Sequence, residues 1–184
     1  MRIILATPLY PPDVAQPAPY VKEVAKRLGE RHQVSVVAYG RLPEKVSGVH
    51  IIAVSKSRPL PLRLLAYTLA LWRAARSADV IYAQNGASVE LPVGLVALFT
   101  GRPLVMCLGD TSAHARADKN YYLKIIERFA FSRARVTVTD MPFERPEILP
   151  FEPMPEAQLQ AYEKAWDSHI ESLEKTFKDI LHEK

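Results

Sequence analysis

Cysteine is almost absent from this sequence, and its absence restricts the chemistry. The single cysteine, Cys107, excludes an internal disulfide bond and any metal site built from several cysteines. A chain without disulfide bonds fits a reducing compartment, so we expect a cytoplasmic protein. Because Cys107 lies within an apolar stretch, a small core residue is favoured over a reactive thiol.

Long apolar runs are missing as well. The longest stretch without a charged residue covers 91–101, which is 11 residues, whereas a membrane-spanning helix needs about 20. The apolar run at the amino terminus ends at Ala6 and is shorter than the roughly 7–15 residues of a signal-peptide core. The sequence therefore predicts neither a membrane span nor a signal peptide.

Glycine is scarce, with 7 residues, and the glycine-rich motifs of nucleotide sites do not occur. There is no Gly-x-Gly-x-x-Gly and no Gly-x4-Gly-Lys-Ser/Thr, which argues against nicotinamide, flavin and P-loop sites. The 5 histidines lack the spacing of metal ligands. We expect no cofactor, no metal and no nucleic-acid partner.

The first 140 residues alternate apolar strands with helical patterns. Strands are expected at 2–7, 33–39, 49–54, 79–83, 103–108 and 135–139, and helices at 20–31, 62–77, 88–100 and 121–132. Nearly all-apolar strands between helices predict a sheet that is covered on both faces. The expected fold is α/β, a Rossmann-like, doubly wound, mostly parallel sheet.

The composition changes after Asp140. Five prolines in 141–155 predict an extended connector. From 156 to 184, large apolar residues recur every 3.5 residues on average between Leu159 and Ile180, which predicts an amphipathic C-terminal helix. We therefore divide the chain into 1–140, 141–155 and 156–184. The helix either packs on its own domain or joins two copies into a homodimer.

The charge is divided in the same way. Residues 1–140 hold 19 Lys/Arg against 10 Asp/Glu, and residues 141–184 hold 5 against 10. A basic body with an acidic tail indicates that the body meets anions or that the tail lies on the body. Charges that serve solubility alone are the other explanation.

Five segments of the chain resemble a known family. The first strand leads to Tyr10-Pro11-Pro12-Asp13 and then YVKEVAKRL; HQVSVVAYG, ADVIYAQN, GRPLVMCLGD and RARVTVTD follow in order. Over about residues 1–140 they resemble the N-terminal, acceptor-side domain of family-four GT-B glycosyltransferases. The resemblance implies a hexosyltransferase-like protein with a sugar or sugar-nucleotide ligand. Since the family's C-terminal donor-binding domain is not recognisable here, it also implies a separate donor-binding chain and no transfer activity in isolation.

The sequence departs from the family pattern at two places. The family has paired glycines in the first loop, where this chain has Ala15-Gln16. It has a histidine before the aspartate that is retained here as Asp110, and this chain has Gly109 instead. Asp110 is the one weak candidate for a catalytic residue. The alternative function is a non-catalytic binding or scaffold module that keeps the fold and assembles through its C-terminal helix.

Ligands of doubly wound sheets bind at the carboxyl ends of the strands, so the loops there supply the candidates. The predicted substrate-binding residues are Tyr10, Asp13, Gln16, Asn85, Gly86, Asp110 and Thr111. An aromatic ring can stack on a sugar, and an amide or carboxylate can bind its hydroxyls. Core packing and helix capping explain the same residues without a ligand. His114, Arg116 and Lys119 either contact a phosphate or form a solvated polar loop.

One apolar segment carries basic residues on both sides. Leu64–Trp72 lacks charge and is flanked by Lys56, Arg58 and Arg63 before it and by Arg73 and Arg76 after it. Such a helix can lie on an anionic membrane surface, which would make the protein peripheral to the inner face of the membrane. A crossover helix buried against the sheet explains the same residues.

Overall fold

The computed structural model describes residues 1–15, 17–139 and 156–183. Six strands form one sheet in the order β3-β2-β1-β4-β5-β6, and every neighbouring pair is parallel. The strands are β1 (Arg2–Thr7), β2 (Gln33–Tyr39), β3 (Val49–Val54), β4 (Val80–Gln84), β5 (Leu104–Cys107) and β6 (Ala134–Val138). The order reverses between β1 and β4, as in a doubly wound Rossmann-like sheet. The predicted fold class is confirmed.

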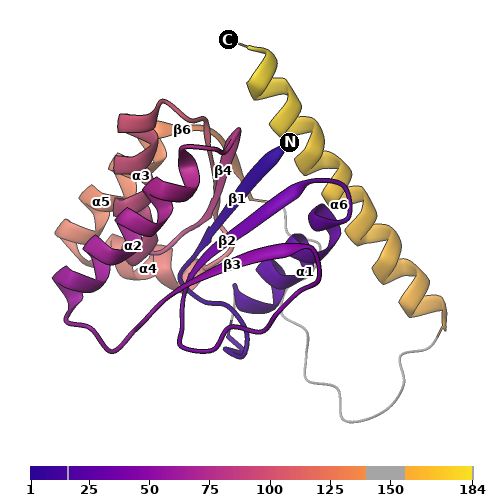
Figure 1. Ribbon diagram of the computed structural model, residues 1–184, viewed down its shortest axis with the longest axis horizontal. Helices are drawn as coiled ribbons and strands as arrows, with labels where there is room; N and C mark the ends of the chain where they lie inside the picture. Colours follow the sequence, from indigo (N-terminus) through magenta and orange to yellow (C-terminus); the bar gives the residue numbers. More distant parts are fainter. Residues whose placement is uncertain (16, 140–155, 184) are drawn as a thin grey trace. The chain divides into compact units, whose positions relative to one another are not determined.

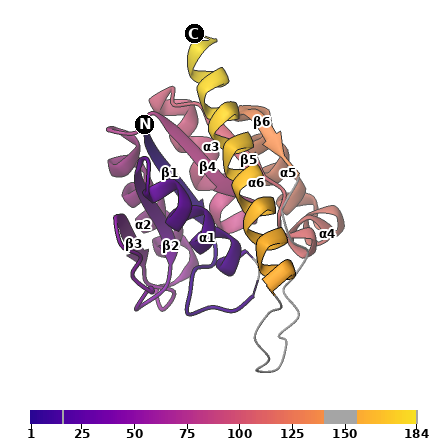
Figure 2. The ribbon, with the colours of Figure 1, turned by 90° about the vertical axis from the view of Figure 1, so that its right-hand side faces the viewer.

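Helices cover both faces of this sheet (Figures 1 and 2). Within the first 139 residues they are α1 (Ala18–Gly29), α2 (Leu60–Ala75), α3 (Ala87–Thr100), α4 (Thr111–Lys119) and α5 (Tyr121–Arg133). The first of these, α1, lies on one face, and α2, α3 and α5 lie on the other. Four of them were expected from the apolar periodicity, with ends that differ by at most two residues.

The helix α4 corrects the expectation of a polar loop around His114, Arg116 and Lys119. Its sequence, TSAHARADK, has no large apolar residue and therefore shows no apolar stripe. Three alanines, which favour helix, and a capping aspartate at Asp110 account for the helix instead. The two alanines Ala113 and Ala117 are its buried residues.

Tyr67 of α2 connects the helical layer to the sheet. Its phenol is fully buried and donates to the carbonyl oxygen of Val37 at 2.8 Å, with the carbonyl oxygen of Thr7 at 3.3 Å. Its ring stacks on that of Tyr39, with 4.4 Å between the ring centroids. Burial raises the pKa of Tyr67 well above its ordinary value, so the phenol stays protonated. The carboxyl ends of β1 and β2 are thereby held against α2.

A glycine lets α3 and α5 approach closely. A Cβ atom added to Gly94 of α3 would lie 2.6 Å from the ring of Phe129 in α5, inside van der Waals contact. The two helices pack along one another; α3 directly follows the end of β4, which bears candidate residues, and α5 follows α4. This packing fixes the scaffold on which the loops after β4 and β5 rest.

The chain forms two compact units, Met1–Thr139 and Asp140–Lys184. The second contains α6 (Glu156–His182), which agrees with the helix expected from the apolar spacing. The expected connector, 141–155, lies outside the described residues. A homodimer through 156–184 stays a prediction. Among the described residues, no helix combines the length and the apolar character that a bilayer span requires.

Candidate functional site at the carboxyl edge of the sheet

The strand order reverses between β1 and β4, and the loops that follow these two strands come together there. Gly86, after β4, lies against Pro8, after β1: a Cβ on Gly86 would be 3.5 Å from the Pro8 ring. Gly86 has a φ of 134°, which a residue with a side chain adopts only under strain. In doubly wound folds the ligand crevice opens at this reversal point. The pair Pro8 and Gly86 therefore marks the centre of the candidate site.

Asn85 connects this point to the next loop along the sheet. Its side chain is fully buried, donates from Nδ2 to the carbonyl oxygen of Asp110 at 2.7 Å and accepts at Oδ1 from the Asp110 N–H at 2.8 Å. The amide thus copies the pairing of a neighbouring strand. Each of its two hydrogen-bonding atoms makes one bond to Asp110, so Asn85 positions Asp110, and its role as a ligand contact stays a prediction.

Asp110 and Thr111 lie at the junction between β5 and α4. One carboxylate oxygen of Asp110, Oδ1, caps the helix by accepting from the Ala113 N–H at 2.9 Å. The other, Oδ2, lies 3.7 Å from Arg116 Nη2, and the Asp110 side chain is 18% exposed. Thr111 is exposed beside it. The expected capping role is present, and one oxygen still faces a cation and solvent.

Beneath these loops lies a buried carboxyl that sequence analysis missed. Glu90 of α3 is 3% exposed and accepts from the Gly86 N–H at 2.8 Å. Burial raises the pKa of Glu90 and the charges of Glu127 and Asp110 add to the rise, while the Gly86 hydrogen bond and His114 oppose it; the resulting pKa is about 7. Glu90 therefore changes its charge near neutral pH while it holds the Gly86 turn. The sequence signal for Glu90 was an acidic residue in the first turn of α3.

Near Glu90, the pair formed by His114 and Glu127 reaches toward solvent. The half-exposed His114 places Nδ1 2.7 Å from Oε1 of the largely buried Glu127, which lies on α5. This hydrogen bond raises the pKa of His114 above its ordinary value, and the Glu127 charge adds to the effect. One ring nitrogen of His114 thus contacts a carboxylate, and a contact between His114 and a phosphate stays a prediction.

The first loop supplies the remaining predicted residues. Tyr10 is buried, and burial together with the Glu44 charge raises its pKa to about 12; its hydroxyl has no hydrogen-bond partner among the described residues. Asp13 pairs with Lys56 at 2.8 Å. Gln16 lies outside the described residues. The ligand roles of Tyr10, Asp13 and Gln16 stay predictions.

Polar side chains also cluster under the end of β4. The hydroxyls of Tyr20 and Tyr82 are 2.6 Å apart, and burial raises the pKa of both phenols and of the Cys107 thiol. The Gln84 amide lies close enough to Cys107 to lower the thiol pKa, although within the described chain it makes no hydrogen bond of normal geometry. Cys107 is fully buried, as expected for a core residue.

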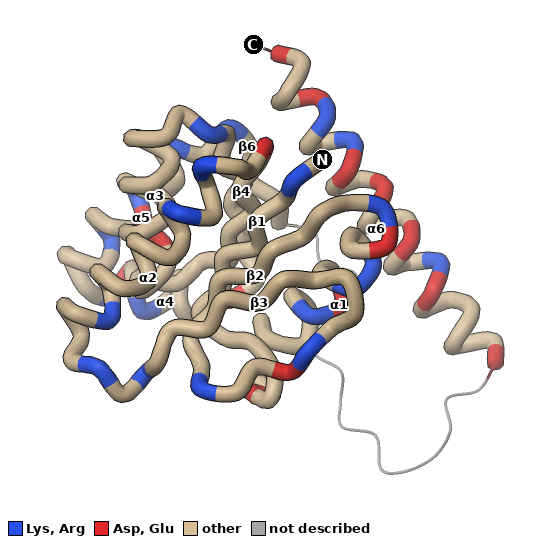
Figure 3. Tube along the Cα trace, viewed as in Figure 1, with Lys and Arg blue, Asp and Glu red and all other residues tan. Residues whose placement is uncertain are grey.

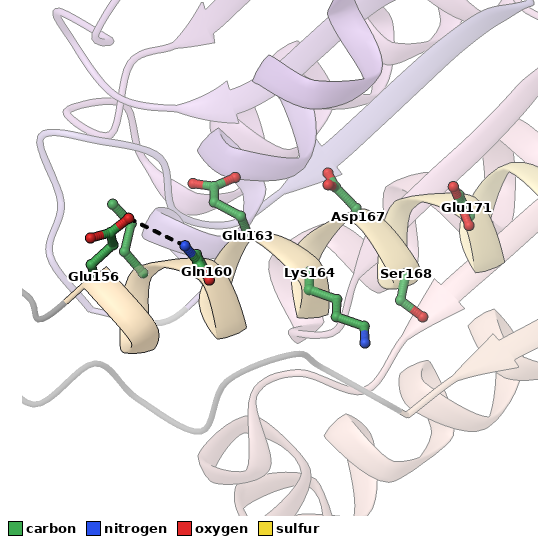
Figure 4. Close-up of a pocket in the computed structure, with 8 residues that line it drawn as sticks. Glu156, Gln160, Glu163, Lys164, Asp167, Ser168 and Glu171 are labelled. Carbon is green, nitrogen blue, oxygen red and sulfur yellow. Dashed lines mark hydrogen bonds between the residues drawn. The ribbon is translucent and has the colours of Figure 1, made fainter.

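A hollow along α6 is a different kind of surface (Figure 4). All of its lining residues belong to this one helix: Glu156, Leu159, Gln160, Glu163, Lys164, Asp167, Ser168 and Glu171. The Gln160 amide donates to Glu156 Oε1 at 3.4 Å, one turn away. Charged residues of a single helix do not enclose a ligand, so the candidate site remains at the carboxyl edge of the sheet.

Comparison with known proteins decides the family. The family model described as glycosyl transferase 4-like domain matches residues 17–159, which is more than half of the chain. The chain belongs to this family. The resemblance seen in the sequence is therefore confirmed, while no curated protein matches the chain.

Solved structures share the fold. HepE of Anabaena in complex with UDP is 17% identical with a TM-score of 0.53, covering 90% of this chain and 41% of HepE. HepE in complex with UDP and glucose is 16% identical, with a TM-score of 0.52 and the same coverage of both chains. A candidate UDP-N-acetylglucosamine 2-epimerase from Listeria monocytogenes is 12% identical, with a TM-score of 0.53 over 74% of this chain and 38% of its own. The chain thus spans about two fifths of the length of these proteins.

Proposed function

We propose that this chain binds a sugar or sugar nucleotide at the strand-end loops that carry Pro8, Gly86 and Asp110, as the acceptor-side domain of a glycosyltransferase. Sugar transfer would then need a donor-binding domain supplied by another chain. Membership of the glycosyl transferase 4-like family supports the ligand class. The observation that carries the position is the pair of hydrogen bonds between Asn85 and Asp110, which fixes a carboxylate next to the strand reversal.

Each group on these loops has a role that its geometry allows. Asp110 Oδ2 accepts from a sugar hydroxyl, because Oδ1 is already used by the Ala113 N–H. The exposed Thr111 offers a hydroxyl and lies at the amino end of α4, where the helix dipole favours a phosphate. Asn85 and Glu90 hold the two loops in place, and Gly86 allows the loop after β4 to lie against Pro8.

The test is calorimetric titration of UDP-glucose, UDP and glucose into the full chain and into Asp110→Asn. Asparagine also caps helices well, so this variant removes the charge and keeps the turn. We expect affinity to fall roughly tenfold, the effect of losing one charge-assisted hydrogen bond. The matched control is Glu30→Gln, an exposed carboxylate next to α1 at the opposite edge. Equal affinities of wild type, Asp110→Asn and Glu30→Gln would contradict the assignment.

Transfer activity tests the need for a second domain. The chain alone should not turn over UDP-glucose, since the resemblance covers the acceptor side only. Mixing it with a separately expressed donor-binding domain of a GT-B enzyme is the complementation arm. Turnover by the purified chain without any partner would overturn this part of the proposal.

A non-catalytic binding module is the second candidate. The two family glycines in the first loop are replaced by Ala15-Gln16, and the family histidine is replaced by Gly109, which favours a role without catalysis. Such a module would bind the same ligands and never gain activity with any donor domain. Ligand binding at Asp110 combined with failed complementation would favour this alternative.

A further inference from the structure

The outer face of α2 exposes several leucine side chains to solvent. Leu60, Leu62, Leu65 and Leu69 are 46–56% exposed, and the last three follow the helix at spacings of three and four residues. The inner face of the same helix is fully buried through Tyr67, Leu71 and Ala75. One face of α2 therefore packs on the sheet layer, the other is an apolar stripe in solvent, and contact with a membrane stays a prediction.

The stripe continues onto the end of α3. The ring of Trp72 in α2 lies 6.2 Å from that of Phe99, measured between centroids. Phe99 is 67% exposed, and the adjacent Leu98 is also exposed. We define the α2 surface as these residues: Leu60, Leu62, Leu65, Leu69, Trp72, Leu98 and Phe99. A monomeric protein rarely exposes a connected apolar patch of this kind without a partner.

The charges around the α2 surface are of one sign. Residues 45–78 contain six Lys/Arg and no Asp or Glu. Figure 3 shows basic residues at both ends of α2 and no acidic residue along it. Lys56 is occupied by Asp13, but Arg58, Arg73 and Arg76 are exposed and make no ion pair within the described part of the chain.

We propose that the α2 surface docks on an anionic lipid bilayer. Leucine and aromatic side chains enter the boundary of headgroups and acyl chains, and the arginines at both ends of α2 contact lipid phosphates. The charge pattern selects this occupant, because a bilayer presents negative charge on every side of an inserted apolar stripe. The inference is independent of the proposed ligand at Asp110.

Binding to vesicles tests the proposal with the full chain. Vesicles of phosphatidylcholine alone are compared in flotation assays with vesicles of equal parts phosphatidylcholine and phosphatidylglycerol. The protein should float with the mixed vesicles only. The double variant Leu62→Gln/Leu65→Gln should weaken that binding by at least roughly tenfold, because two apolar side chains no longer enter the lipid. Since both leucines are exposed, circular dichroism should show an unchanged fold.

The matched control is Leu42→Gln. Leu42 is 85% exposed, but it lies in a loop that the Lys22–Glu44 ion pair ties to α1, away from α2. It should bind like wild type. Equal flotation of the Leu62/Leu65 variant and wild type, or equal flotation with and without phosphatidylglycerol, would overturn the proposal.

The electrostatic part has its own measurement. Arg73→Gln/Arg76→Gln should weaken binding by about fivefold for each charge removed, and added salt should reduce the difference. A second copy of the chain is the competing occupant, because α6 is acidic and amphipathic. Concentration-dependent dimers without lipid that Leu62→Gln/Leu65→Gln abolishes would contradict the bilayer and identify that occupant instead.

Discussion

At the carboxyl edge of the sheet, two buried polar side chains are bonded to backbone atoms, whereas at the opposite edge a partly exposed arginine and aspartate pair with one another. Asn85 and Glu90 illustrate the first arrangement. Arg2 and Asp79 illustrate the second, with side chains that are 53% and 28% exposed. Buried polar groups lower stability unless every one is satisfied. Their concentration at one edge indicates that this edge has a task besides folding.

The opposite edge has a shallow hollow of its own. It is lined by Met1, Arg2, Gly29, Glu30, Arg31, His32, Gln33 and Asp79. Strand starts are joined there by backbone hydrogen bonds, such as Gln33 N–H to the Met1 carbonyl at 3.0 Å. Positive and negative side chains alternate, so no one charge is selected. Mutations at the two edges therefore test whether the polar side chains of the carboxyl edge differ from ordinary polar side chains on the surface.

The largest difference is expected for Asn85→Ala. The substitution leaves the Asp110 N–H and carbonyl without their partner at a fully buried position, which lowers the free energy of unfolding by roughly 2–4 kcal/mol. Urea denaturation provides the measurement. Ser77→Ala, which removes an exposed side-chain hydrogen bond near the opposite edge, is the control and should change stability by less than about 0.5 kcal/mol. Similar losses in both variants would remove the distinction between the edges.

An intermediate effect is expected for Glu90→Gln and depends on pH. Because the folded-state pKa of Glu90 is about 7 and its ordinary value is 4.5, folding favours the protonated carboxyl. This contribution is complete below about pH 4.5 and is lost as the pH rises through 7. Glutamine is neutral throughout and still accepts from Gly86, so the variant should be more stable at pH 8 by roughly 1–3 kcal/mol.

Unfolding free energies at pH 5 and pH 8 test this claim. The raised pKa of His114 gives a loss of the same sign, but His114 is present in both proteins and drops out of the comparison. Glu30→Gln should keep the wild-type pH dependence. A Glu90→Gln protein whose stability falls with pH as steeply as that of wild type would show that Glu90 is ionised throughout.

The smallest effect is expected for Asp79→Asn. Burial raises the pKa of Asp79, but hydrogen bonds and charge from Arg2 outweigh it and lower the pKa overall. The pair is partly exposed, so its loss should reduce stability by at most about 1 kcal/mol, and less in high salt. Denaturation at low and high salt checks this. If Asp79→Asn lowered the free energy of unfolding more than Asn85→Ala does, the proposed ranking of the two edges would be reversed.

The fold was largely readable from the sequence, because apolar periodicity reports buried faces directly. All six strands and four helices of the first 139 residues appear near their expected positions. The helix α4 was missed because alanine burial leaves no apolar stripe. Positions of site residues followed from strand ends, but their contacts did not. That Asn85 holds Asp110, and that Glu90 lies under Gly86, depends on packing between distant segments.

The most direct test of the account locates a ligand by nuclear magnetic resonance. UDP-glucose is titrated into the isotopically labelled full chain, and backbone amide shifts are followed at both edges. Gly86 and Thr111 report on the carboxyl edge. Gly29, the last residue of α1, and Gly101, which follows α3, report on the opposite edge. We predict saturable shifts at Gly86 and Thr111 that Asp110→Asn weakens, with Gly29 and Gly101 unchanged. Shifts confined to Gly29 and Gly101 would contradict the account.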